Sequence, residues 1–76
     1  MPGKDDEKLE NRIRRLRFDR GEMTQQELGN RAGVTRQTII ALEAGKYSPS
    51  LLLAFRLARA FGVAVEAVFQ YDSVNP

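Results

Sequence analysis

Seventy-six residues are enough for one small domain, and we expect no separate sensor or catalytic domain beside it. Cysteine and histidine are both missing, which excludes disulfides, Cys/His zinc sites and every mechanism that needs an imidazole base. We therefore expect a protein without enzymatic activity, cofactor or metal. The longest apolar run, residues 51–55, is far shorter than the roughly 18 residues of a membrane span, so we expect a cytoplasmic protein with no membrane partner.

The net charge of +2 is small, but its distribution along the chain is uneven. Residues 9–46 contain eight basic and five acidic side chains, whereas the basic and acidic residues of 47–76 balance. Any surface that attracts a polyanion is therefore expected in the first two-thirds of the chain.

The chain begins with a polar segment, residues 1–8, which lacks periodicity and is expected to be a flexible arm. From Leu9 onward the apolar spacing is helical: Leu9, Ile13 and Leu16 fall on one stripe. This spacing predicts a first helix that ends near Gly21. We find no alternation typical of strands anywhere in the chain.

The next segment carries the signals of two short helices. Thr24 and Glu27 have the spacing of a capping box, which predicts a second helix over about residues 25–32. Gly33 can supply a left-handed helix end, and Thr35 can cap a third helix over about residues 36–44. Two short helices joined by a tight glycine turn are the sequence form of a helix-turn-helix, with an ordinary helical hairpin as the alternative.

The remaining sequence predicts two further helices. Ser48 as a cap and Pro49 at the first helical position predict the start of a fourth helix, which ends at Gly62. Its expected buried face consists of Leu51, Leu53, Ala54, Leu57, Ala58 and Phe61. A short fifth helix is predicted over about residues 64–70, and residues 73–76 form a tail. The predicted fold is thus an all-α, compact five-helix bundle, with the domain at residues 9–72.

The third predicted helix has an unusual outer face. Ile39 and Leu42 fall on its inner side, where they can fill a core. The opposite side carries Arg36, Gln37, Ile40, Ala41 and Ala44. Arginine and glutamine can make paired hydrogen bonds to guanine and adenine edges, and isoleucine and alanine can contact a thymine methyl. This face suits a DNA major groove; packing of Ile40 on a neighbouring subunit is the alternative.

Taken together, residues 23–29 (MTQQELG), 32–39 (AGVTRQTI) and 42–46 (LEAGK) resemble the phage-repressor and Cro-like helix-turn-helix family, also called the xenobiotic-response-element family. The resemblance extends over about residues 11–71. It implies a lambda-repressor-like DNA-binding domain and a transcriptional regulator, expected to act as a nucleoid-associated repressor that binds a palindromic operator as a homodimer. Gly29 departs from the family, which commonly has alanine where the second and third helices cross.

The resemblance also implies roles for particular residues. The base readers would be Arg36, Gln37, Ile40 and Ala41. The phosphate contacts would be Gln25, Thr35, Thr38 and Lys46. Arg17 and Glu43 match a partly buried ion pair between the first and third helices.

The expected partners are double-stranded DNA and a second copy of the chain. Dimer contacts would come from apolar residues left over once the core is filled, and the candidates are Leu52, Phe55, Phe69 and Tyr71. The alternative function is an antitoxin-like or adaptor module whose main partner is another protein. The modest charge and the leftover apolar residues motivate that alternative.

Overall fold

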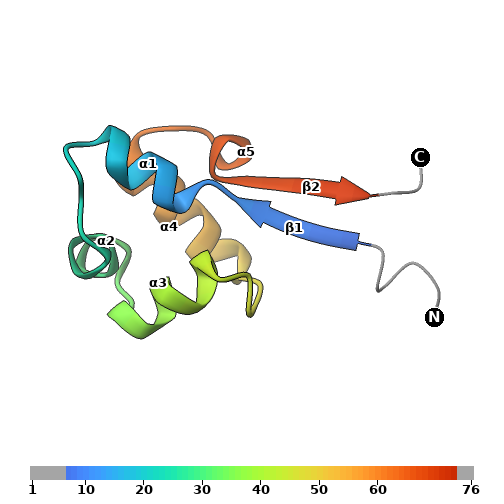
Figure 1. The fold of residues 1–76 in the computed structure, drawn as a ribbon, viewed down its shortest axis with the longest axis horizontal. Helices are drawn as coiled ribbons and strands as arrows, with labels where there is room; N and C mark the ends of the chain where they lie inside the picture. The colour runs from blue at the N-terminus through green and yellow to red at the C-terminus, as the bar shows by residue number, and fades with distance from the viewer. Residues whose placement is uncertain (1–6, 74–76) are drawn as a thin grey trace.

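The computed structural model describes residues 7–73, with side chains from residue 9 to residue 71. In chain order, five helices follow strand β1 and precede strand β2, and the two strands lie side by side at one end of the helical body (Figure 1). The elements are β1 (Glu7–Asn11), α1 (Ile13–Asp19), α2 (Gln25–Ala32), α3 (Arg36–Glu43), α4 (Leu51–Phe61), α5 (Val65–Val68) and β2 (Phe69–Ser73).

The strands show that the expectation of an all-α fold was wrong. β1 and β2 form an antiparallel ribbon in which Leu9 is opposite Tyr71 and Asn11 is opposite Phe69. Leu9 therefore belongs to a strand, and α1 begins only at Ile13. The strand was missed because its partner lies at the other end of the chain and its own apolar alternation is too short to recognise.

The expected chain ends shift for the same reason. The arm predicted over residues 1–8 includes two residues of β1, and the tail predicted over 73–76 begins with the last residue of β2. The rest of both segments lies outside the described residues.

The signals around α2 and α3 are confirmed. The Thr24 hydroxyl accepts a hydrogen bond from the Glu27 amide at 3.0 Å, and the Glu27 carboxylate accepts one from the Thr24 amide at 2.8 Å. Gly33 ends α2 with a φ of 76°, and the Thr35 hydroxyl accepts from the Thr38 amide at 3.2 Å. These local bonds satisfy the free amides at both helix starts.

The last two helices are shorter than predicted. Ser50, not Ser48, caps α4, because its hydroxyl accepts from the Leu53 amide at 3.0 Å. Leu51 is then the first helical residue and is 73% exposed, so its expected burial was wrong. α5 is a single turn, Val65–Val68, because the chain enters β2 at Phe69.

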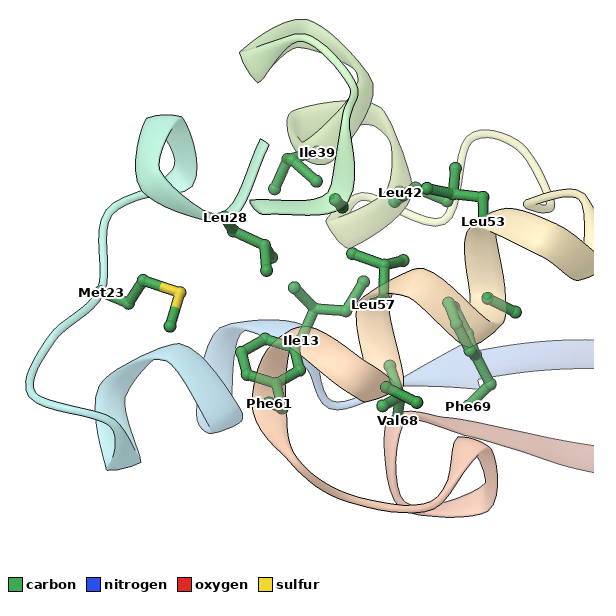
Figure 2. Close-up of a cluster of buried hydrophobic side chains, with 13 residues drawn as sticks. Ile13, Met23, Leu28, Ile39, Leu42, Leu53, Leu57, Phe61, Val68 and Phe69 are labelled. Atoms are coloured by element: carbon green, nitrogen blue, oxygen red, sulfur yellow. The ribbon is translucent and has the colours of Figure 1, made fainter. Parts of the chain in front are cut away.

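One apolar core joins all five helices (Figure 2). The largest fully buried side chains are Ile13, Leu28, Ile39, Leu42, Leu57 and Val68. Since α3 contributes two of them, it is held to the body along its whole inner side. Its outer side is left free.

Candidate nucleic-acid interface

The candidate interface is centred on the outer side of α3. Arg36, Gln37 and Ala44 are exposed, Ile40 is 39% exposed, and Ala41 is half-buried. Neither Arg36 nor Gln37 has a hydrogen bond or ion pair to another side chain of the described part of the chain. α3 therefore presents two long polar side chains and a small apolar surface that have no partner in the part of the chain that the structure describes.

The crossing of α2 and α3 is unusually close at Gly29. A Cβ on this residue would lie 2.8 Å from the carbonyl oxygen of Val34 and 3.4 Å from that of Thr35. Such a contact with the backbone is too short for any side chain. The departure from the family's common alanine thus has a physical reason, since the turn into α3 passes directly over this position.

Arg17 and Glu43 are brought together, and their contacts join three helices. Arg17 Nε lies 2.7 Å from Glu43 Oε2, and Arg17 Nη2 lies 3.2 Å from Oε1. Arg17 Nη1 also donates to the Met23 carbonyl at 2.7 Å. Only 14% and 12% of the two side chains are exposed, so water screens the pair little. The pair links the end of α3 to α1 and to the residue that precedes α2.

Gln25 is the third member of this polar group. Its Nε2 donates to Glu43 Oε1 at 3.2 Å, which holds the amide in place at the first residue of α2. One N–H of that amide is engaged by Glu43, which leaves the second for another acceptor. Gln25 and Arg36 line the same open hollow. The start of α2 and the start of α3 therefore share one surface.

Thr35, Thr38 and Lys46 lie at the two ends of α3. The hydroxyls of Thr35 and Thr38 are 3.1 Å apart at its first turn, beside Arg36. Lys46 is exposed in the turn after α3, where its amide donates to the Ala41 carbonyl at 2.9 Å. The predicted phosphate contacts therefore flank the predicted base readers on both sides.

The dimer candidates separate into two groups. Leu52, Phe55 and Tyr71 are exposed by 60%, 56% and 64%. Phe69 is only 9% exposed, so the expectation that it was left over for a partner was wrong. Its side chain fills the core where β2 begins.

Sequence reasoning also missed three residues near these candidates. Leu9 is 42% exposed because it belongs to the ribbon and not to α1. Tyr47 is 45% exposed in the turn between α3 and α4. Asn11 bonds to α3 through its side chain, Nδ2 to the Leu42 carbonyl at 2.9 Å. Only the register of the ribbon, which the sequence did not reveal, could have indicated Leu9 and Asn11.

Within the described residues, no group of three or more acidic, histidine or cysteine side chains is arranged to hold a metal ion. None of the helices there has the length and apolar character needed to cross a membrane.

A helix-turn-helix family model matches residues 9–68, most of the chain. The chain belongs to this family, of the Cro/C1 type, whose members are DNA-binding transcriptional regulators and not enzymes. The resemblance seen in the sequence is thereby confirmed.

Individual relatives agree with this assignment. An HTH-type transcriptional regulator of Methanothermobacter thermautotrophicus is 59% identical over 61 residues, which cover 79% of this chain and 87% of the relative. Another, of Methanocaldococcus jannaschii, is 56% identical over 50 residues, covering 66% and 76%. The cryptic phage CTXphi transcriptional repressor RstR of Vibrio cholerae is 34% identical over 64 residues, covering 84% of this chain and 57% of RstR.

A crystal structure of a protein from Bacteroides fragilis has the same fold. Its TM-score is 0.72 at 22% identity, and the match covers 82% of this chain and 98% of that one.

Proposed function

We propose that this protein represses transcription by binding a palindromic operator as a homodimer, with α3 in the major groove of each half-site. The observation that carries the proposal is the outer face of α3, where Arg36 and Gln37 are exposed and bond to no other described side chain. The similarity to a phage transcriptional repressor supports the sign of regulation.

The chemistry of that face fits base readout. Arg36 can pair with O6 and N7 of a guanine, and Gln37 with N6 and N7 of an adenine. Ile40 and Ala41 bring no polar group that would stay unpaired in the groove, and either can contact a thymine methyl. We assign sequence specificity to these four residues.

Phosphate contacts would fix the register of α3 in the groove. Gln25 stands at the start of α2, where the helix dipole favours an anion and Glu43 already orients the amide. Thr35 and Thr38 can donate from the first turn of α3, and Lys46 from beyond its last turn. Such contacts position a protein on DNA without reading its sequence.

Repression by this route needs no catalysed reaction, because occupation of the promoter is sufficient. A dimer with half-sites about 34 Å apart along one face of the duplex would exclude other proteins from the promoter it covers. The site of action is the compartment that holds the DNA, which is the nucleoid of the cytoplasm.

The test begins with selection of bound duplexes from a random library, and the winning sequence is then used with variants. Arg36→Ala should weaken binding to the selected site by about 1 to 3 kcal/mol and relax the preference at one base position. Gln25→Ala should weaken the selected and random duplexes by similar factors. Arg59→Ala, which removes an exposed charge on α4, is the matched control for lost charge.

Two outcomes would contradict the proposal. Selection could enrich no sequence, with all binding lost at moderate salt, which is the behaviour of phosphate contacts alone. Alternatively, Arg36→Ala and Arg59→Ala could have equal effects on selected and random DNA, which would remove Arg36 from base readout.

A further inference from the structure

The ribbon of β1 and β2 extends away from the helical body (Figure 1). Its inner end is fixed, because Phe69 enters the core and the Asn11 side chain bonds to α3. Its outer end runs beyond every helix. An isolated two-stranded ribbon is marginally stable in water, so this part of the fold is incomplete within one chain.

One face of the described ribbon carries two exposed apolar side chains. Residues two apart on a strand share a face, so the pair Leu9–Tyr71 lies on the same face as the pair Asn11–Phe69. Phe69 is buried, but Leu9 and Tyr71 are 42% and 64% exposed. The apolar surface of the core thus continues outward along the ribbon.

Within residues 7–73, no strand pairs with the outer edge of β1. The Arg12 amide donates to the Val68 carbonyl at 2.8 Å, next to the pair Asn11–Phe69. Hydrogen-bonded pairs alternate along an antiparallel ladder, so the amide and carbonyl of Leu9 point away from β2. Beside this edge lies an open hollow of about 540 Å³, lined by Leu9, Leu42, Tyr47, Pro49 and Phe69 among others. A free strand edge next to apolar side chains is a surface for strand pairing.

We propose that the dimer forms through this edge: the β1 strands of two copies pair antiparallel across a two-fold axis at Leu9, giving one four-stranded sheet. This interface deepens the proposed function, since it identifies the surface that makes the homodimer. Two identical antiparallel edges are complementary to each other by symmetry. Leu9 of each copy would then pack against Leu9 of the partner subunit.

Charge complementarity favours a second copy as the occupant. With the axis at Leu9, the register places position 8, a lysine, opposite Glu10 of the partner subunit, and does so twice by symmetry. No position of this pairing sets like charges against each other. The edge of β2, centred on Tyr71, would place Gln70 opposite an aspartate and offers no such charge pair.

The pairing also sets how close the two copies of Asn11, and the helices bonded to them, lie to each other. Asn11 is two residues from the axis, which places the two copies of Asn11 about 14 Å apart at about 3.4 Å per residue. Each Asn11 is bonded to Leu42, near the end of α3 closest to the ribbon, and α3 extends about 12 Å from one end to the other. Whether the two copies of α3 then meet successive major grooves, about 34 Å apart, is tested by the operator spacing that the dimer accepts.

The experiment uses the full chain in the absence of DNA. Because the protein has no cysteine, Leu9→Cys introduces a single thiol at the proposed axis. Hydrogen-bonded antiparallel neighbours have Cα atoms about 5.5 Å apart, within the range of disulfides. We expect mild oxidation to convert Leu9→Cys to a covalent dimer. The matched control is Leu52→Cys. Leu52 lies on α4 and lines a different hollow, so this variant should stay largely uncrosslinked.

Sedimentation equilibrium gives the second readout. Leu9→Lys should raise the dimer dissociation constant more than about tenfold, since it removes two apolar contacts and sets two like charges at the axis. Leu52→Lys should leave the constant unchanged, and circular dichroism should show native helix content for both variants. The ribbon interface is overturned if the wild-type chain is monomeric, or if Leu9→Lys dimerises normally.

The two proposals can fail separately. A dimer that depends on Leu52 and not on Leu9 overturns the ribbon interface but leaves the operator-binding dimer. If the dimer depends on Leu9 but library selection enriches no sequence, the ribbon interface is supported and the proposed binding of an operator is contradicted.

Discussion

The α2–α3 unit and the β1–β2 ribbon complete their structures in different ways. In the α2–α3 unit, both helix starts are capped by neighbouring residues, and the Arg17–Glu43 pair closes the far end of α3 within the same chain. In the ribbon, only the inner half is covered, while Leu9 and Tyr71 remain exposed beside an open strand edge. The unit proposed to read DNA is closed by contacts within one chain, whereas the ribbon, as far as the described residues show, leaves a strand edge unpaired.

The largest loss of stability is expected when the polar group of Arg17, Gln25 and Glu43 is broken, because this group closes the α2–α3 unit. Glu43→Ala leaves the partly buried Arg17 charge without its carboxylate and removes an acceptor from Gln25. We expect a loss of about 2 kcal/mol in the free energy of unfolding, below the usual result of breaking one side of a fully buried pair because this pair is partly exposed. Urea denaturation followed by circular dichroism measures it.

Asp19→Ala is the matched control for this change. It breaks the Arg15–Asp19 pair, whose atoms are 3.7 Å apart and whose side chains are 79% and 54% exposed. Exposed pairs contribute less than about 1 kcal/mol, so the urea concentration at the midpoint of unfolding should barely change. Dimerisation should be unchanged in both variants, since neither residue belongs to the ribbon. Equal small losses would show that the Arg17–Glu43 pair does not fix α3.

A smaller effect is expected where α2 and α3 cross. Gly29→Ala gains about 1 kcal/mol of helix propensity but places a methyl group 2.8 Å from a backbone oxygen that cannot rotate away. Overpacking of this kind costs about 1 to 3 kcal/mol, so we expect a net destabilisation near 1 kcal/mol. Weaker binding to the selected operator should accompany it, because α3 must shift relative to α2.

Asn30→Ala on the same helix separates propensity from crowding. Asn30 is exposed and bonds only to Gln26, so this variant should be as stable as the wild type or slightly more so. If Gly29→Ala were the more stable of the two, the close crossing would not limit the packing of α2 and α3.

The same contrast explains what the sequence could predict. Thr24, Gly33 and Thr35 act on residues two to four positions away, so their spacing was sufficient to locate α2 and α3. The Arg17–Glu43 pair was reached only through the resemblance to a family, since nothing local links residues so far apart. The ribbon depends on pairing between the two chain ends, for which a five-residue strand carries no signal.

Near the fourth helix, the sequence analysis placed the cap at Ser48, whereas the structure places it two residues later, at Ser50. The choice depends on which hydroxyl reaches an amide in the folded turn. The roles of Arg36 and Gln37 stay predictions, because exposure shows that they are available to DNA and not that they touch it.

The smallest effect is expected at the joint between the two regions. Asn11 donates to the Leu42 carbonyl and accepts from the Ile13 amide at 3.2 Å, so Asn11→Ala removes two bonds between the ribbon and the helices. We expect a loss of about 0.5 kcal/mol, since Leu42 keeps a bond from the Gly45 amide. Gln70→Ala, which removes an exposed bond within the C-terminal segment, is the control and should cost less.

Operator spacing tests that joint more directly than stability does. If Asn11 transmits the geometry of a paired ribbon to α3, the wild-type dimer should reject operators with one base pair added or removed at the centre. Asn11→Ala should dimerise as strongly but discriminate less between those spacings, because α3 can then turn relative to the sheet. Retention of the full spacing preference would mean that the core alone fixes α3 relative to the ribbon, and that the contact between Asn11 and Leu42 is dispensable.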